Sequence, residues 1–406
     1  MSLIGPIPFQ KYGDGACFAR LAAISARLGI DLAGFGKSGA VIVGSNGKGS
    51  TAAMLSSLLQ APGAQVGRFT SPHLFRLNER FSINGADISD EALERHWLRV
   101  LGAVPPDGDA LGAFEFLFLI AADWFAHEGC TATVWEAGIG GRFDPVRAIK
   151  ARRVGLTSLD LEHMHLLGET LELIAYDKLD AAPAGGQAFI SPSCLHLEDR
   201  LRAYCGLRDV TPVFVEAGGA EIAAPLAGAY QQDNAALAWA IARDMGVRDA
   251  GASARLAQTS WPGRLETISE TPLVVLDVGH TPDAVRRAKA GFEAMCAGAR
   301  GHRVLVCGVS TDKPAADIVS VLAPGFDVII ATSAPHKWRP AGEIAALAQA
   351  AAPTAAVSVC GDIVAAYARA FAQGEDAAIY VAGGLFIAIA FKAAHLGMDP
   401  GRLVFF

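Results

Sequence analysis

The sequence predicts an α/β protein built from parallel sheets with helices on both faces. Short β-branched runs alternate with longer alanine- and leucine-rich stretches, as in "AVIVG" followed by "STAAMLSSLLQA". The short runs are apolar throughout, which is typical of strands that are buried on both faces. The chain has 406 residues, of which 52% are hydrophobic and 18% charged. Because this is long for a single hydrophobic core, we expect two domains.

The strand-like and helix-like runs continue in order along the chain and indicate where the domains divide. The first group of strand-like runs comprises "AVIVG", "TATVWEAG" and "RVGLTSL". A segment marked by proline and glycine, "WPGRLETISETP", then precedes a second group, "PLVVLDVG", "RVLVCGV", "DVIIATS" and "AIYVAGG". We therefore predict one domain over residues 1–268 and a smaller α/β domain over residues 269–406.

The charge and the cysteines exclude several classes of protein. A net charge of -7 argues against a general polyanion binder, so we expect no nucleic-acid partner. The seven cysteines show no C-x-x-C pair and no zinc-like spacing, which is typical of reduced thiols in a cytoplasmic protein. The N-terminal residues lack the pattern of a signal peptide, and "FEFLFLIAADWFA" is too short to span a bilayer. We expect a cytoplasmic protein without a membrane partner.

The stretch "VIVGSNGKGST" suggests a phosphate-binding loop. A strand that ends in glycines and opens a helix gathers free backbone N–H groups at the positive end of the helix dipole. Lys48 adds a mobile positive charge, and Ser50 or Thr51 offers a hydroxyl for a phosphate-bound metal. The strict P-loop pattern is not met, because Ile42 occupies the first glycine position and Gly49 intervenes before the hydroxyl. An ordinary strand-to-helix turn is the alternative.

Seven motifs then occur in a fixed order: "GSNGKGST", "TSPHL", "NERFSINGADIS", "EAGIGGRFDPVR", "LEHMHLLGETLELIAYDK", "WPGRLE" and "LDVGHTP". Together they resemble the folylpolyglutamate synthase/dihydrofolate synthase family, a branch of the ATP-dependent Mur-type amide ligases. The resemblance implies a P-loop Mur-ligase-like N-terminal domain and a smaller Rossmann-like C-terminal domain. It also implies an enzyme of folate biosynthesis and one-carbon metabolism, in which a carboxylate attacks ATP to give an acyl phosphate and an amine then displaces phosphate.

The resemblance places the metal and the catalytic groups. The family's magnesium ligands fall on Ser71, Glu136 and His163, of which the first two supply the oxygen atoms that Mg²⁺ prefers. Lys178 matches the family's lysine that reacts with CO₂ to form a carbamate; without the resemblance it is a solvated helix residue. Arg264 is expected to reach the phosphates. The predicted catalytic residues are Lys48, His163, Lys178 and Arg264.

The resemblance also implies the nucleotide contacts. Asn234 in "YQQDNAA" is expected at the adenine and Asp277 at the ribose hydroxyls, with His280 and Lys313 near the nucleotide. The predicted nucleotide-binding residues are Asn46, Gly47, Lys48, Gly49, Ser50, Thr51, Asn234, Arg264, Asp277, His280 and Lys313. Because these residues fall in both predicted domains, we expect ATP in a cleft that domain closure completes.

The departures from the family concentrate where the acid substrate is expected to bind. "GAFE" replaces the family's "TYFE", so that Ala113 stands in place of a bulky aromatic residue. "FDPVR" replaces "LDATN", with a proline that fixes the backbone and Arg147 in place of an amide. "GHTP" replaces "AHNP". The predicted substrate-binding residues are Phe114, Glu115, Phe143, Asp144, Pro145 and Arg147.

Three functions are compatible with these observations. The favoured one is a monomeric ligase that joins L-glutamate to dihydropteroate or folate, using ATP and Mg²⁺. The second is a paralogous ligase with the same chemistry on another carboxylic acid, because a pocket that loses hydrogen-bonding partners discriminates poorly for its original ligand. The third is a nucleotide-binding accessory protein without turnover. Six retained residues argue against the third: Lys48, Ser71, Glu136, His163, Lys178 and Arg264.

Overall fold

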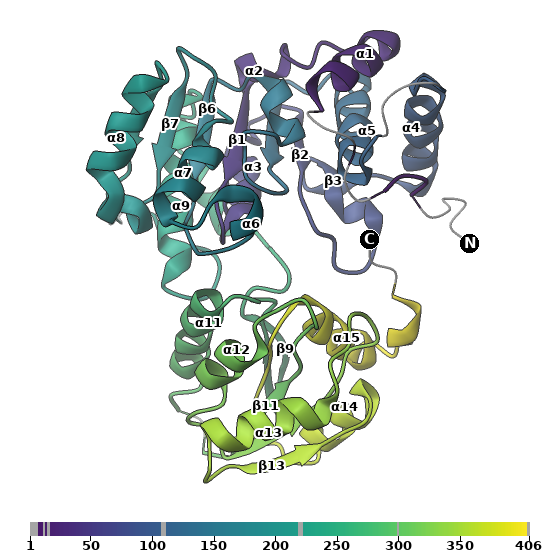
Figure 1. Ribbon diagram of the computed structural model, residues 1–406, viewed down its shortest axis with the longest axis vertical. Coiled ribbons are helices and arrows are strands. Elements are labelled where there is room, and N and C mark those ends of the chain that lie inside the picture. Colours follow the sequence, from purple (N-terminus) through teal and green to yellow (C-terminus); the bar gives the residue numbers. More distant parts are fainter. Residues whose placement is uncertain are drawn as a thin grey trace. The chain divides into compact units, whose positions relative to one another are not determined.

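A computed structural model describes residues 7–10, 13, 17–106, 111–217, 222–298 and 300–403 (Figure 1). The chain forms two compact units, the first comprising Met1–Pro225 and Gln231–Ser260 and the second Leu226–Tyr230 and Trp261–Phe405. The predicted α/β class is confirmed, because each unit is a parallel-rich sheet with helices. Among the described residues, no helix is both long enough and apolar enough to cross a lipid bilayer.

The first unit contains an eight-stranded sheet in the order β4-β3-β2-β5-β1-β6-β7-β8. The six strands from β2 to β8 in this order are parallel, and β3 and β4 add an antiparallel edge. The strands are β1 (Gly39–Val43), β2 (Val66–Phe69), β3 (Phe81–Ile83), β4 (Ala86–Asp87), β5 (Ala132–Glu136), β6 (Arg153–Leu156), β7 (Gln187–Ile190) and β8 (Thr211–Phe214).

Helices cover both faces of this sheet. The helices are α1 (Phe18–Leu28), α2 (Phe35–Ser38), α3 (Lys48–Leu59), α4 (Asp90–Ala103), α5 (Ala113–His127), α6 (Met164–Leu167), α7 (Leu171–Leu179), α8 (Glu198–Leu207), α9 (Tyr230–Asp244) and α10 (Ala252–Ala257). Val41 and Val43 of β1 join a core that includes α1, α4 and α5. The intervening Ile42 lies beside Gly155 of β6 and Ile241 of α9. The side chains of β1 are therefore buried on both faces of the sheet, which explains why the strand is apolar throughout.

Three short 3₁₀ helices also belong to this unit: η1 (Leu77–Arg80), η2 (Pro145–Ile149) and η3 (Pro192–Leu197). η2 begins at a proline, whose fixed backbone angle suits the first position of a helix. It connects the loop after β5 with the start of β6. η2 therefore runs from the carboxyl end of one strand to the amino end of the next.

The second unit contains a six-stranded sheet in the order β13-β12-β11-β14-β10-β9. Its strands are β9 (Glu266–Glu270), β10 (Leu273–Leu276), β11 (Arg303–Cys307), β12 (Val328–Ala331), β13 (Ala356–Val359) and β14 (Ala378–Ala382). β9 alone is antiparallel to its neighbour, and the predicted boundary after residue 268 falls within this strand. Its helices are α11 (Pro282–Met295), α12 (Ala315–Leu322), α13 (Ala341–Ala351), α14 (Ile363–Phe371), α15 (Leu385–His395) and η4 (Pro400–Arg402).

Candidate active site

The glycine-rich turn after β1 has the backbone of a phosphate cradle. Gly44 and Gly47 adopt positive φ angles of 145° and 87°, and α3 begins directly afterwards at Lys48. A Cβ atom on Gly44 would collide with the Thr157 hydroxyl, and one on Gly47 would meet the Asn234 amide. Only glycine fits both positions. The turn therefore presents the N-terminus of a twelve-residue helix at the carboxyl end of a central strand.

The neighbouring strand β6 fixes the shape of this turn. The Thr157 hydroxyl donates to the Asn46 carbonyl at 2.6 Å, and the Ser158 hydroxyl donates to the same carbonyl at 3.0 Å. The Ser158 hydroxyl also accepts from the Asn46 amide at 3.1 Å. Thr157 and Ser158 directly follow β6, so the cradle depends on the pairing of β1 with β6.

Two lysines meet at the phosphate loop. Lys48 Nζ donates to the carbonyls of Gly44 and Ser45 at 2.8 and 3.1 Å. Lys178 Nζ, from α7, donates to the same Gly44 carbonyl at 3.1 Å and to Glu162 Oε1 at 2.9 Å. The Lys178 side chain is only 1% exposed, so the structure excludes a solvated helix residue at this position. Burial lowers the pKa of Lys178, against the opposing effect of Glu162.

Glu162 was not singled out in the sequence, yet it is central to this cluster. Burial alone would raise the pKa of its carboxyl, but Lys48 and Lys178 together lower it to about 2. The carboxylate is therefore ionised at neutral pH and paired with Lys178. The sequence signal was its place in "LEHM", directly before the predicted ligand His163.

Of the predicted metal ligands, two lie together. Glu136 ends β5 and is buried, and its Oε2 accepts from the Ser71 backbone amide at 2.9 Å. His163 precedes α6 with a positive φ of 46° and is half-buried. Within the described ranges, no three His, Cys, Asp or Glu side chains are grouped closely enough to hold a metal ion. The oxygen atoms of Glu136 and Ser71 fit Mg²⁺, whereas the role of His163 stays a prediction.

Two arginines, half-buried Arg68 and buried Arg80, interact electrostatically with Glu136, and neither was among the predicted site residues. Burial lowers the pKa of both Arg68 and Arg80 to about 10, an effect that Glu136 opposes in each. Arg80 Nε also donates to His73 Nδ1 at 3.0 Å, which fixes the orientation of the histidine of "TSPHL". Arg68 lies two residues before the motif "TSPHL", and Arg80 lies within "NERFSINGADIS". The sequence therefore shows where they stand in the chain but not how far the fold buries them.

Helix α9 brings the predicted adenine contact to the phosphate loop. Asn234 Nδ2 donates to Gln231 Oε1 at 2.9 Å, and Gln231 Nε2 donates to Ser50 Oγ at 3.3 Å. Asn234 also lies against Gly47. The structure therefore assembles the predicted nucleotide-binding residues of the first unit at one place: Asn46, Gly47, Lys48, Gly49, Ser50, Thr51 and Asn234.

The predicted acid-binding residues differ in whether their polar groups are already bound. Glu115 is buried and forms an ion pair with Arg20, with two N–O distances of 2.5 Å. Asp144 accepts from the backbone amides of Gly138, Ile139 and Val146 at 2.8, 3.1 and 3.1 Å. Burial raises the pKa of Asp144 to about 6, against these hydrogen bonds. Both carboxylates therefore maintain local structure.

The other members of this set differ in exposure. Phe143 is 63% exposed. Phe114 is half-buried against Phe69, with ring centroids 5.5 Å apart. Pro145 begins η2 and is buried. Arg147 donates one N–H to the Arg142 carbonyl at 2.9 Å, and among the described residues its other donors have no hydrogen-bond partner, so they can bind a ligand.

The second unit contains the remaining predicted nucleotide contacts. Asp277 follows β10 and is buried, and its two oxygens accept from the amides of Leu265 and Gly279 at 3.1 and 2.7 Å. Burial raises the pKa of Asp277, and Arg264 opposes the increase. His280 Nδ1 lies 3.3 Å from the Val278 carbonyl. The predicted roles of Arg264, Asp277, His280 and Lys313 are not tested by these contacts and stay predictions.

Comparison with known proteins identifies the family. Residues 263–385 match the Mur ligase, glutamate ligase domain. The dihydrofolate synthase/folylpolyglutamate synthase of Bacillus subtilis is 30% identical over 319 residues, which cover 69% of this chain and 73% of that protein. A probable bifunctional folylpolyglutamate synthase/dihydropteroate synthase of Halobacterium salinarum is 32% identical over 376 residues, which cover 85% of this chain but 45% of that protein.

A solved structure extends the likeness to the fold. The folylpolyglutamate synthase of Mycobacterium tuberculosis, complexed with ADP, superposes with a TM-score of 0.82 at 25% identity. The match covers 96% of this chain and 96% of that one, so both units are included. The alignment with the Bacillus subtilis relative covers more than two thirds of that protein at 30% identity. The chain therefore belongs to the dihydrofolate synthase/folylpolyglutamate synthase family.

Proposed function

We propose that the chain is an ATP-dependent acid–amino-acid ligase that adds L-glutamate to dihydropteroate or folate and forms ADP. The observation that carries this proposal is the convergence of Lys48 and Lys178 on the Gly44 carbonyl beside the helix N-terminus. A γ-phosphate repels an approaching carboxylate unless its charge is neutralised. The Lys48 ammonium, held at this backbone cradle, supplies part of that neutralisation.

The reaction requires two displacements. An oxygen of the acceptor carboxylate attacks the γ-phosphorus and the bond to ADP breaks, which gives an acyl phosphate. The glutamate amine then attacks the carbonyl carbon, phosphate leaves and the amine loses a proton. Lys48 donates to two backbone carbonyls at 2.8 and 3.1 Å, and its ammonium is the group that would turn to contact the γ-phosphate. Glu136 and Ser71 are the residues that would hold Mg²⁺, which when bound supplies further positive charge to the phosphates.

We further propose that Lys178 carries a carbamate in the active enzyme. Its burial lowers its pKa and so favours the neutral amine that attacks CO₂. The ammonium first loses one proton, the neutral amine then attacks the carbon of CO₂, and a second proton leaves as the N–C bond forms, so that the side chain changes from a cation to an anion. Because the ammonium is now paired with Glu162 at 2.9 Å, modification requires that this ion pair open.

The remaining assignments are inferred from the family. Residues 1–268 would bind ATP and residues 269–406 would contribute the second ligase domain, with Arg264 at the phosphates and Asp277 at the ribose. We expect His163 to complete the metal ligands and a monomer to act in the cytoplasm. The relative from Mycobacterium tuberculosis was solved with ADP, which supports the nucleotide assignment.

A second candidate is a ligase of the same chemistry with a different acid. The observation that favours it is the altered sequence around the acid site, where Ala113 and Arg147 replace an aromatic residue and an amide of the family pattern. Glu115, in turn, is occupied by Arg20 and so cannot recognise a substrate amide without breaking a buried ion pair. A non-catalytic accessory protein is disfavoured by the lysine cluster, because binding without turnover does not require it.

The test is Mg²⁺-dependent release of ADP with L-glutamate and either dihydropteroate, tetrahydrofolate or no acid. Release with a pteridine acid, together with a glutamylated product by mass, would support the folate assignment. Lys48→Ala should abolish release while the far-ultraviolet dichroism is unchanged, and exposed Lys37→Ala should behave as the wild type. If neither acid causes ADP release in protein that is shown to bind ATP, the result would favour the second candidate.

A further inference from the structure

Residues 70–76 form an irregular loop that carries Ser71, a predicted metal ligand. The loop lies between β2 and η1. β2 and β3 pair as antiparallel neighbours, so that residues 70–80 connect two adjacent strands. A hairpin connection usually needs only about two to five residues. The shape of this longer connection must be set by contacts outside the sheet, and the residues of η1 supply them.

The carboxylate of Glu79, in η1, holds the end of this loop. Its Oε2 atom accepts from the backbone amide of Leu74 at 2.6 Å, and its Oε1 atom accepts from those of Phe75 and Arg76 at 2.9 and 2.8 Å. Successive backbone N–H groups in a turn can form a concave site for an anion, and hydrogen bonds to a carboxylate are stronger than those between neutral groups. Glu79 therefore fixes the backbone of three consecutive loop residues.

Arg80, the next residue of η1, holds the start and the middle of the loop. Its carbonyl accepts from the Thr70 amide at 3.0 Å, and its Nε atom donates to His73 Nδ1 at 3.0 Å. Arg80, Thr70 and His73 are all buried. Together with the contacts of Glu79, these bonds attach the loop to η1 along its whole length. Ser71 therefore stands between two attached residues, Thr70 and His73.

η1 is itself anchored to the start of α4. Asn78 Nδ2 donates to the Ile88 carbonyl at 2.8 Å and to Asp90 Oδ1 at 3.0 Å. At the other end of this series of contacts, the Ser71 amide donates to Glu136 Oε2 at 2.9 Å. The contacts therefore run from α4 through η1 and the 70–76 loop to the two predicted metal ligands that lie together.

We propose that Glu79 is a positioning residue for the metal site. Its carboxylate fixes the amides of residues 74–76, and the loop so fixed holds Ser71 against Glu136 before a metal ion binds. This inference rests on the proposed function, because it takes Ser71 and Glu136 as metal ligands. Groups that orient metal ligands without being ligands themselves typically change metal affinity by about 10–100-fold when they are removed.

The test measures binding of Mn²⁺, which takes the same oxygen ligands as Mg²⁺ and whose unbound form is counted by electron paramagnetic resonance. The protein is titrated with Mn²⁺ at saturating ADP, and binding of ADP alone is measured separately with a chelator present. Glu79→Gln keeps the size of the side chain but removes its charge and replaces one acceptor oxygen with an NH₂ group. The control is Glu128→Gln, at an exposed position directly after α5.

Hydrogen exchange followed by mass spectrometry gives a second readout that needs no metal. Peptides that cover residues 70–76 should exchange faster in Glu79→Gln than in the wild type, because the amides lose an acceptor, whereas peptides from α3 should not change. Thermal unfolding shows whether each variant is folded. If Glu79→Gln does not fold, Glu79→Asp takes its place with the same expectations, because it keeps the charge but draws the carboxylate back by one methylene.

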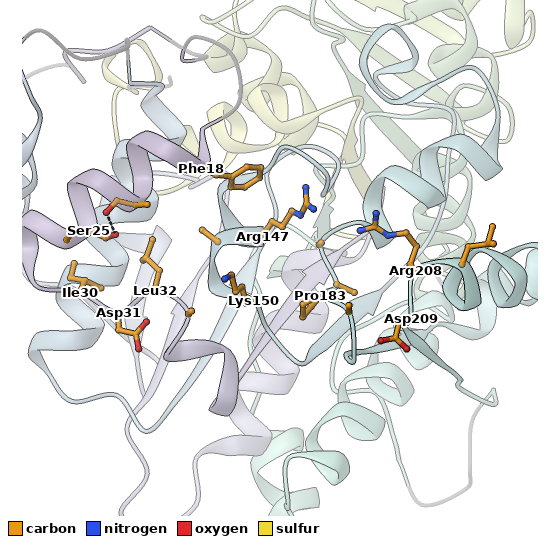
Figure 2. A pocket seen from close by; sticks show the side chains of 18 residues that line it. Phe18, Ser25, Ile30, Asp31, Leu32, Arg147, Lys150, Pro183, Arg208 and Asp209 are labelled. Carbon is orange, nitrogen blue, oxygen red and sulfur yellow. Dashed lines mark hydrogen bonds between the residues drawn. The ribbon is translucent and has the colours of Figure 1, made fainter.

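We expect Glu79→Gln to weaken Mn²⁺ binding by about 10–100-fold and to change the affinity for metal-free ADP by less than about twofold, since the nucleotide is assigned to the phosphate loop. The predicted acid site is not altered by the substitution, because Arg147, which Figure 2 shows on the wall of a groove, belongs to η2. The Glu128→Gln control should match the wild type in every measurement.

Unchanged Mn²⁺ affinity, or unchanged exchange of the 70–76 loop, would overturn the proposal. An equal loss of Mn²⁺ and ADP binding in a folded variant would also overturn it, because that result indicates general disruption rather than a positioning role. If the wild type itself bound no Mn²⁺ in the presence of ADP, the metal assignment of the proposed function would be wrong, and this inference with it. None of these measurements requires the acid substrate or ligase turnover.

Discussion

Glu162→Gln tests how strongly one buried carboxylate holds the two lysines at the phosphate loop. The variant keeps the shape of the side chain and removes its charge, so that Lys48 and Lys178 remain close together without a carboxylate between them. Removing one partner of a buried ion pair leaves an uncompensated charge, which is more costly than losing a pair at the surface. The folded protein should therefore lose stability.

The magnitude follows from the pKa of Glu162. The folded protein lowers this pKa from 4.5 to about 2, a difference of about 2.5 pH units. At about 1.4 kcal/mol for each unit, the folded state gains ~3 kcal/mol from the ionised carboxylate. Because the pKa is depressed, this contribution is complete above the unfolded pKa and is lost as the pH falls from 4.5 towards 2. Lys178 can shed its proton in the variant, so we expect a loss of ~2–3 kcal/mol near neutral pH.

The assay is urea unfolding of the wild type and the variant, followed by tryptophan fluorescence, at about pH 7 and about pH 3. The control is Glu198→Gln, because Glu198 and Arg202 form an exposed i,i+4 pair that should contribute less than ~0.5 kcal/mol. A loss below ~1 kcal/mol at neutral pH, or an equal loss at both pH values, would refute the reasoning. The double variant Glu162→Gln/Lys178→Met should be more stable than Glu162→Gln alone, because it leaves no unpaired charge on α7.

Three further predictions concern other parts of the site. Lys178→Ala should lose ligase activity. If a carbamate is required, short carboxylic acids should restore part of that activity. Failure of every acid tested in the turnover assay would count against the carbamate. Arg147→Asn should increase the use of pteroate acids in the ADP-release assay, whereas an unchanged acid preference would remove Arg147 from the acid site. Arg20→Met should lower the free energy of unfolding by ~3–5 kcal/mol in urea titrations, because Glu115 is left buried without its partner; Arg20→Met/Glu115→Leu should recover much of that loss.

The central strands could be predicted because their burial on both faces leaves a direct mark on the sequence. β1, β5 and β6 are buried on both faces, so each is a continuous apolar run that the sequence displays directly. β9 was not predicted: its sequence "ETISE" carries two glutamates, and it forms the antiparallel edge of the second sheet. β8 contains a proline at an edge position, which the sequence alone does not distinguish from a loop. The prediction was therefore reliable for the most apolar central strands, whereas the interior strands β2 and β7 and several edge strands were not predicted.

The burial of Lys178 illustrates a second limit. Helix α7 has no strong apolar face, so its sequence does not show which side is covered. Lys178 is buried because the phosphate loop and Glu162 lie over it, and both contacts come from segments distant in the chain. The charged partner makes this burial tolerable, and that pairing is created only by the fold.

Pairing that only the fold creates also decides which residues can recognise the acid substrate. Sequence reasoning treats Glu115 and Asp144 as equal to Arg147, since all three stand in altered motifs. In the structure, however, Glu115 holds Arg20 and Asp144 holds three backbone amides, so substituting either would disturb the fold before it changed specificity. Within the part of the chain that the structure describes, Arg147 makes one hydrogen bond, to a carbonyl, and keeps free donors. Specificity for the acid is therefore best tested at Arg147, where a change in substrate use can be separated from a change in stability.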